Sequence, residues 1–178
     1  MTVFHGSVCE VRCPDLSRSK RYIDFGPGFY VTDIQRQAER WARRKAARFG
    51  GKAIVSTYSL NEDWLGYRVK TFPEASKEWL DFVCDCRNGL TPYLSYDIIS
   101  GKVANDRVFQ AIDMYRRGIW DENRTLQEIT YYEDSSQIAI NGTVSLKPAE
   151  STKDPKPFSP KDLFYDKTPE MADVFNGH

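Results

Sequence analysis

The sequence predicts an α+β fold. Runs rich in β-branched and aromatic residues, typical of strands, occupy 2–10, 29–31, 53–60, 65–72, 93–99 and 137–141. Between them, apolar residues recur at helical spacing in 33–49, 74–87, 106–117 and 126–132. Helices and strands are therefore both present, in an irregular order typical of an α+β protein.

Composition and charge limit the function. The chain has 178 residues, 25 basic and 25 acidic, so its overall charge gives no reason to expect a nucleic acid or a membrane as partner. No apolar run approaches the ~20 residues of a membrane span, and no signal peptide opens the sequence, so a cytoplasmic protein is expected. The spacing of the four cysteines and the presence of only two histidines predict no metal site.

A stretch at 24–42 organises the chain, because it combines a glycine-rich turn, a short strand and a helix. Gly26 and Gly28 flank Pro27, so the backbone can turn sharply and approach another group closely. Thr32 and Gln35 form a capping box for the helix, which Gly50 and Gly51 end. A second capping box, Thr125 with Glu128, predicts the start of the last helix.

A glycine also lies inside the first strand, where His5-Gly6-Ser7 is followed by more strand residues. Glycine weakens a strand, and it often marks close approach by a ligand or by another backbone. The alternative is that His5 has only a structural role, with its hydrogen bonds satisfied within the strand.

Together these segments resemble a known family. His5-Gly6-Ser7 followed by Phe-Gly-Pro-Gly-Phe-Tyr-Val-Thr at 25–32 is similar to the NAD-binding core of the ADP-ribosyltransferase superfamily, in its histidine-tyrosine branch. This branch includes diphtheria-toxin-like enzymes and poly(ADP-ribose) polymerases. The chain to about Lys147 further resembles a set of small bacterial domains of that superfamily. The shared segments are 24–30, 37–42, 96–106 and the strand that begins at Gln137.

The resemblance implies a split β-sheet core with flanking helices, NAD as the substrate and no metal. It implies that His5 bonds the adenosine-side ribose and that the backbone of Gly6 contacts the nicotinamide amide. Ser7 would bond the nicotinamide-side ribose, and Tyr30 would stack on the nicotinamide ring. Gly28, in the turn, and Asn105, in a shared segment, complete the residues expected to line the NAD pocket.

Gln137 departs from the well-known members, which carry a glutamate at this position. Glutamine keeps the hydrogen-bonding shape but loses the negative charge and any role as a general base. Transfer of a single ADP-ribose is therefore expected rather than polymer formation. Glu133, in the preceding loop, is the alternative source of a catalytic carboxylate. If Gln137 has no such role, it is an ordinary polar residue at a strand edge.

The predicted helix after Tyr30 carries basic residues along one side. Arg36, Arg40 and Arg44 recur every four residues, which predicts a basic face. Such a face is usually only solvated, but here it is a candidate phosphate track beside the site. We therefore expect an RNA or DNA acceptor in preference to a protein side chain.

Residues 1–146 are predicted to form the catalytic domain. The Pro- and Lys-rich tail, 147–178, either lies over that domain or docks on a partner such as an antitoxin or chaperone. The expected function is NAD-dependent mono-ADP-ribosylation of a macromolecule by a bacterial toxin or defence effector. The alternative is a catalytically silent NAD-fold module that acts through a partner.

Overall fold

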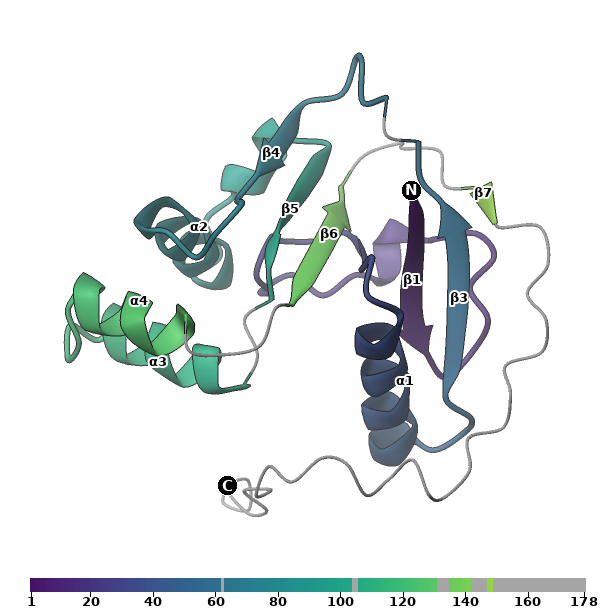
Figure 1. Cartoon of the computed structure of the whole chain (residues 1–178), viewed down its shortest axis with the longest axis horizontal. Coiled ribbons are helices and arrows are strands. Elements are labelled where there is room, and N and C mark those ends of the chain that lie inside the picture. Colours follow the sequence, from purple (N-terminus) through teal and green to yellow (C-terminus); the bar gives the residue numbers. More distant parts are fainter. Residues whose placement is uncertain (62, 104–105, 131–134, 142–146, 149–178) are drawn as a thin grey trace.

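The computed structural model describes residues 1–61, 63–103, 106–130, 135–141 and 147–148. Within these ranges the chain forms four α-helices and two β-sheets, which confirms the predicted α+β class (Figure 1).

The first sheet has three strands in the order β1-β3-β7. They are β1 (Thr2–Ser7), β3 (Ile54–Ser59) and β7 (Lys147–Pro148), and both pairings are antiparallel. The first pairing runs from Thr2 opposite Ser59 to Ser7 opposite Ile54. Within this sheet, β1 pairs along one edge only, with β3. The other edge of β1 faces the second sheet.

The second sheet has four strands in the order β2-β6-β5-β4. They are β2 (Phe29–Val31), β6 (Ser136–Ile140), β5 (Ile98–Lys102) and β4 (Val69–Thr71). The β4–β5 pairing is parallel and the other two are antiparallel. The two sheets meet at a bridge in which Phe4 and Thr32 exchange backbone hydrogen bonds of 2.8 and 3.0 Å.

The helices are α1 (Gln35–Phe49), α2 (Lys77–Arg87), α3 (Asp106–Arg116) and α4 (Glu122–Thr130). Figure 1 shows α1 lying along β1, and α3 and α4 paired beside α2. Two short 3-10 helices, Leu16–Arg18 and Pro92–Ser95, lie in connecting segments. None of the described helices has the length and apolar character that crossing a membrane requires.

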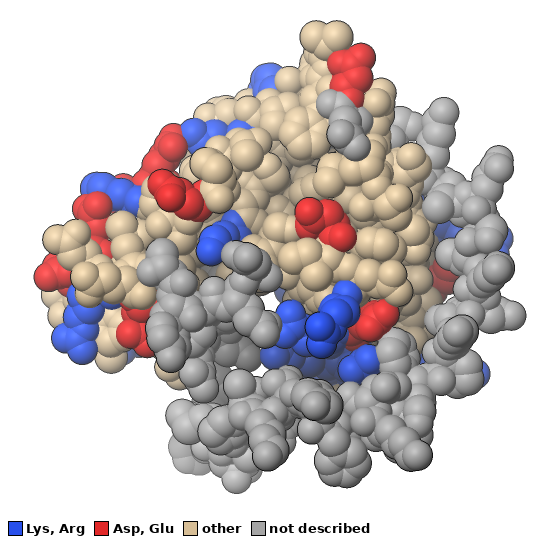
Figure 2. All heavy atoms as spheres, in the orientation of Figure 1, with Lys and Arg blue, Asp and Glu red and all other residues tan. Residues whose placement is uncertain are grey.

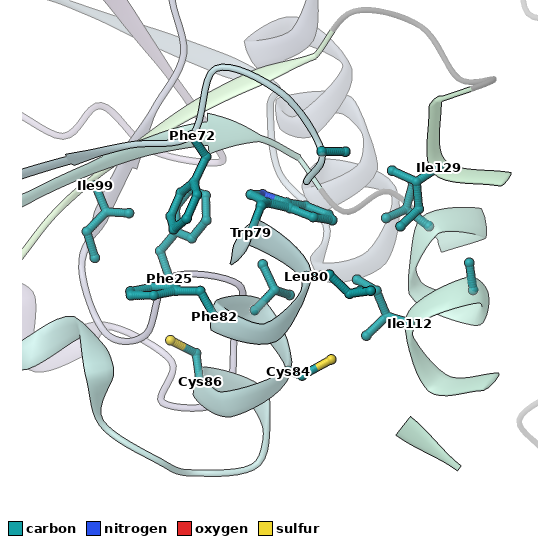
Figure 3. Packing of buried hydrophobic residues seen from close by; sticks show 14 of the residues in the cluster. Phe25, Phe72, Trp79, Leu80, Phe82, Cys84, Cys86, Ile99, Ile112 and Ile129 are labelled. Carbon is teal, nitrogen blue, oxygen red and sulfur yellow. The ribbon is translucent and has the colours of Figure 1, made fainter. Parts of the chain in front are cut away.

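The hydrophobic core lies on both faces of the four-stranded sheet. One cluster contains Phe25, Trp79, Leu80 and Ile99, and it packs α2 and α3 against the sheet (Figure 3). The other cluster contains Ile98 and Ile138 together with Val3 of β1. Because neighbouring residues of a strand point to opposite faces, β5 and β6 contribute to both clusters. This double burial fixes the register of the strands that carry the site.

Both predicted capping boxes are wrong. Thr32 remains part of the bridge to β1, and its Oγ1 accepts the Ile34 N–H at 3.1 Å, so α1 begins after Ile34 without a side-chain cap. Thr125 lies inside α4, where its hydroxyl donates to the Asp121 carbonyl at 2.7 Å. Asp121 is the residue that caps α4, because its Oδ1 accepts the Arg124 N–H at 2.8 Å.

Two of the predicted strands also differ from the structure. Residues 93–95 belong to a 3-10 helix, and the strand there is β5, which starts only at Ile98. The strand predicted at 65–72 is reduced to β4. The end of α1 is as predicted, with Gly50 at a positive φ of 76°.

Candidate functional site

The structure brings the three predicted motif segments onto neighbouring strands. His5 lies on β1, which is bridged to the end of β2 through Phe4 and Thr32. Tyr30 lies on β2 opposite Ala139 of β6, the strand that carries Gln137. Tyr30 and Gln137, more than a hundred positions apart in sequence, therefore lie on neighbouring strands.

His5 is held in one tautomer. Its Nδ1 lies 2.7 Å from the carbonyl oxygen of Tyr30, and since that oxygen can only accept, Nδ1 carries the proton. The ring stacks on Phe29 with the centroids 4.5 Å apart. Burial lowers the pKa of His5 to about 4, so the ring is neutral at physiological pH. Nε2 is then a hydrogen-bond acceptor, which can accept a hydrogen bond from a hydroxyl group.

Gly6 is required by packing against α1. A Cβ at this position would overlap the carbonyl oxygen of Ala38 and lie 2.8 Å from the amide nitrogen of Ala42. The backbone whose close approach was predicted is thus the chain's own helix. The Gly6 carbonyl accepts a 2.7 Å hydrogen bond from Lys45 Nζ. Contact between Gly6 and a nicotinamide amide stays a prediction.

Ser7 and Gly28 have local contacts of their own. Ser7 is buried, and its hydroxyl lies 4.0 Å from the Cys9 sulfur. The Gly28 N–H donates to Ser19 Oγ at 2.8 Å, which ties the glycine turn to the preceding loop. A Cβ on Gly28 would overlap Asn141 Oδ1 and lie 3.2 Å from the Ile140 carbonyl oxygen. Their predicted roles in binding NAD are untested by these contacts.

Tyr30 closes the glycine turn with its hydroxyl group. The phenol donates to the Gly26 carbonyl at 2.7 Å and accepts from the Phe25 N–H at 3.0 Å. Burial, and to a lesser extent the nearby Asp24 charge, raise the Tyr30 pKa well above its ordinary value. The hydroxyl is therefore neutral and doubly bonded. Any stacking on a ligand must involve the ring face.

Gln137 is buried, with 4% of its surface exposed, and it does not stand free at a strand edge. Its Nε2 donates to Asp24 Oδ2 at 2.9 Å and lies 3.4 Å from the Lys102 carbonyl oxygen. Asp24 also forms a buried ion pair with Arg87, whose Nε is 3.0 Å from Oδ1. The side chain expected to face NAD is thus anchored by a carboxylate.

Asp24, Arg87 and Gln37 make contacts beside the candidate site that the sequence did not indicate. Asp24 opens the organising stretch, but nothing nearby in sequence identifies its partners. Gln37 is buried on the first turn of α1, and its Nε2 donates to the Ser136 carbonyl at 2.6 Å. This bond ties the start of α1 to the start of β6. The resemblance of 37–42 to the bacterial domains was the available signal for Gln37.

Two predicted site residues, Glu133 and Asn105, lie outside the described residues. Asp97, in the same shared segment as Asn105, has a structural role, since its carboxylate accepts the Arg68 backbone N–H at 2.9 Å and pairs with the Arg68 side chain. Among the described residues, no three His, Cys, Asp or Glu side chains are grouped as metal ligands would be.

The predicted basic face of α1 is present on its exposed side. Arg36, Arg40, Arg44 and Arg48 are all exposed and recur every four residues. Figure 2 shows basic side chains gathered where Figure 1 places α1. Arg43, on an adjacent side, is 3.7 Å from Glu39 and so is partly neutralised. We name the four exposed residues the α1 arginine stripe.

Comparison with known families places the chain. A model of a protein family of unknown function, DUF3990, matches residues 1–149. The chain belongs to this family. No curated protein and no solved structure matches the chain. The DUF3990 match spans every strand and helix described above and every predicted site residue, but it does not itself assign an activity.

Proposed function

We propose that the protein is a NAD-dependent mono-ADP-ribosyltransferase that modifies a macromolecule, with a nucleic acid favoured as the acceptor. The observation that carries this proposal is the position of His5, Tyr30 and Gln137 on three neighbouring strands. This order and adjacency suit a ligand that must contact all three segments, and NAD is long enough to do so.

The chemistry of these residues fits the reaction. The glycosidic bond between nicotinamide and ribose breaks with oxocarbenium-like character, nicotinamide leaves, and an acceptor atom bonds to the ribose carbon and loses its proton. His5, neutral and with Nε2 as an acceptor, is suited to hold a ribose hydroxyl. Gln137 is suited to hold another hydroxyl near the reacting carbon. Neither residue acts as a strong base, which is consistent with a single transfer.

A biological setting follows from the same proposal. Uncontrolled consumption of NAD and modification of a nucleic acid or a protein would harm the cell that makes the enzyme, as the activity of a toxin or defence effector does. The partner would then be an antitoxin or chaperone, with residues 147–178 as the proposed docking segment.

One observation favours a second candidate, a catalytically silent module that binds NAD or a nucleotide. The Tyr30 hydroxyl and the Gln137 amide nitrogen both make hydrogen bonds within the protein. If these bonds hold the site in a purely structural arrangement, the protein would bind NAD or a nucleotide without catalysing a reaction.

Incubation of the full chain with labelled NAD and total RNA, DNA or protein tests both candidates. We expect nicotinamide release and label transfer by the wild type. His5→Ala should lower the rate at least about a hundredfold, because the ribose loses its positioning contact. Asn123→Ala, at an exposed position of α4, is the matched control and should retain full activity.

Two results would decide against the enzyme. Wild-type protein that binds NAD but releases no nicotinamide with any acceptor supports the silent module. Equal rates for the wild type and for a folded His5→Ala variant would show that His5 does not contact the substrate. Circular dichroism of each variant establishes that it is folded.

A further inference from the structure

Asp24 joins two parts of the chain that are far apart in sequence. Its Oδ1 pairs with Arg87 of α2, 63 residues away, and its Oδ2 accepts from Gln137 of β6, 113 residues away. Asp24 and Gln137 are 7% and 4% exposed. This carboxylate is therefore compensated on one side by a guanidinium and on the other by an amide.

This contact determines which way the Gln137 amide faces. An ionised carboxylate has only acceptor atoms, so the amide must turn its nitrogen toward Asp24. The second neighbour of Nε2, the Lys102 carbonyl oxygen at 3.4 Å, is also an acceptor. Rotating the amide by half a turn would set Oε1 against two acceptors in a buried place, which costs free energy. Gln137 Oε1 is thereby directed away from Asp24.

The charged and titratable groups around this pair come from α2, β2 and β5. From α2, Arg87 contributes its guanidinium group, and the pKa of Cys86 is raised to about 12, chiefly by burial. From β2, the Tyr30 pKa is raised well above its ordinary value. From β5, Lys102 contributes its backbone carbonyl. Cys86 and Tyr30 are therefore both neutral near pH 7, and the polar partners of the Asp24 carboxylate are the Arg87 guanidinium and the Gln137 amide.

We propose that Asp24 and Arg87 are positioning residues that make the oxygen of Gln137, rather than its nitrogen, the atom that contacts the ribose hydroxyls of NAD. This inference rests on the proposed function. An amide whose N–H groups donate to a carboxylate is polarised, and its oxygen becomes a stronger acceptor. Gln137 thus supplies the acceptor atom, while the negative charge lies on Asp24, the residue to which the Gln137 amide donates.

Gln137→Glu tests the orientation. To replace the amide N–H, the new carboxyl must keep a proton on the oxygen that faces Asp24, and the Asp24 charge makes that proton hard to remove. We expect activity close to the wild type at about pH 5, then a fall on the order of tenfold per pH unit once the raised pKa is passed. The wild type should show no such fall.

The double variant Asp24→Asn with Gln137→Glu is the matched control. The asparagine introduced at position 24 can donate an N–H to the carboxylate introduced at position 137, so that carboxyl group no longer needs a proton. We expect the alkaline fall in kcat to disappear in this variant. A merely structural role for Asp24 would not move the pH profile in this way.

A stability series separates failure of the inference from failure of the proposed function. The melting temperature of Gln137→Glu, relative to the wild type, should fall as pH rises, because the folded state binds a proton that the unfolded chain releases. This readout needs no NAD. A wild type that never consumes NAD overturns the ribose contact, and the melting series then still decides whether Asp24 orients the amide.

Two outcomes overturn the orientation itself. The first is a Gln137→Glu protein whose kcat and melting temperature match the wild type at every pH, since that carboxylate would not face Asp24. The second is a double variant that keeps the alkaline fall of the single one. All rates are measured at temperatures where circular dichroism shows folded protein.

Discussion

His5 is neutral mainly because its ring is desolvated, and a charged neighbour contributes less. Desolvation is the largest cause of its lowered pKa, and the Lys45 charge adds to it, while the hydrogen bond to the Tyr30 carbonyl opposes both. A neutral ring with a fixed tautomer presents the same acceptor atom at every pH above about 4. The residue can therefore position a ligand without titrating during the reaction.

This depressed pKa predicts a pH dependence of stability. The unfolded chain binds a proton on His5 near pH 6.5 and the folded chain only near pH 4, so folding loses stability as pH falls through this window. The contribution is fully present above pH 6.5 and amounts to about 3 kcal/mol at most. Urea unfolding between pH 4 and 7 measures it.

His5→Gln is the comparison variant, because glutamine can still donate to the Tyr30 carbonyl and does not titrate. Its stability should change less with pH than that of the wild type over this window. The other histidine, His178, is present in both proteins and cancels. Identical pH slopes in the two proteins would contradict a half-buried, neutral His5.

At this scale the sequence predicted the strands that carry His5, Tyr30 and Gln137, and the structure confirms these strands. The roles of the three residues came from the family resemblance and stay predictions. The partners of these side chains could not be predicted. Asp24 and Arg87 are 63 positions apart in sequence, and an arginine at the end of a helix does not by itself indicate a distant carboxylate partner. Gln137 was expected either to hydrogen-bond a ligand or to be an ordinary polar residue at a strand edge, whereas it is buried and its nitrogen is bound to Asp24.

Among the elements, β1 packs closely against α1. Gly6 lets the strand approach until its Cα lies against the helix backbone at Ala38 and Ala42, and Lys45 then reaches the Gly6 carbonyl. Both alanines are fully buried. The position of His5 depends on this approach, because the next residue sets how near β1 lies to the rest of the site.

Gly6→Ala should therefore destabilise the protein by about 3 kcal/mol, since the added methyl group meets backbone atoms that cannot rotate away. Gly66→Ala is the control, because a Cβ there meets nothing within 4 Å and only the positive φ of 88° is strained. It should cost about 1 kcal/mol. Chemical denaturation measures both, and equal losses would argue against the close packing.

The two misassigned capping boxes have different causes. Thr32 pairs with β1, a tertiary contact that a local pattern cannot reveal. Thr125 lies within a helix that Asp121 caps, so there a second local cap, four residues earlier, takes precedence. Where glycine decided the outcome, as at the end of α1, the prediction is confirmed because the left-handed backbone leaves few alternatives.

The molecule as a whole has equal numbers of acidic and basic residues, so only a local cluster of basic residues could attract a polyanion. The α1 arginine stripe is a regular exposed row, and α1 packs directly on the strand that carries His5. A nucleic acid bound along this helix would thus lie near the proposed site. Its binding should weaken with salt in proportion to the phosphates neutralised.

Arg40→Glu combined with Arg44→Glu should lower modification of RNA strongly and modification of protein little. The slope of RNA binding against salt concentration, on logarithmic axes, should decrease by about two, one for each lost contact. Arg12→Glu with Arg117→Glu changes the net charge equally at exposed positions elsewhere and should have little effect. Equal losses from both pairs would mean that the stripe is not the acceptor surface.

The triad of Asp24, Arg87 and Gln137 restricts how this site can change by mutation. Removing Asp24 alone leaves a buried guanidinium without its carboxylate, a loss on the order of 3–5 kcal/mol. Introducing a glutamate at position 137 alone sets two carboxylates together. A change from glutamine to glutamate at this position therefore requires a change of Asp24 at the same time, because each change alone destabilises the site.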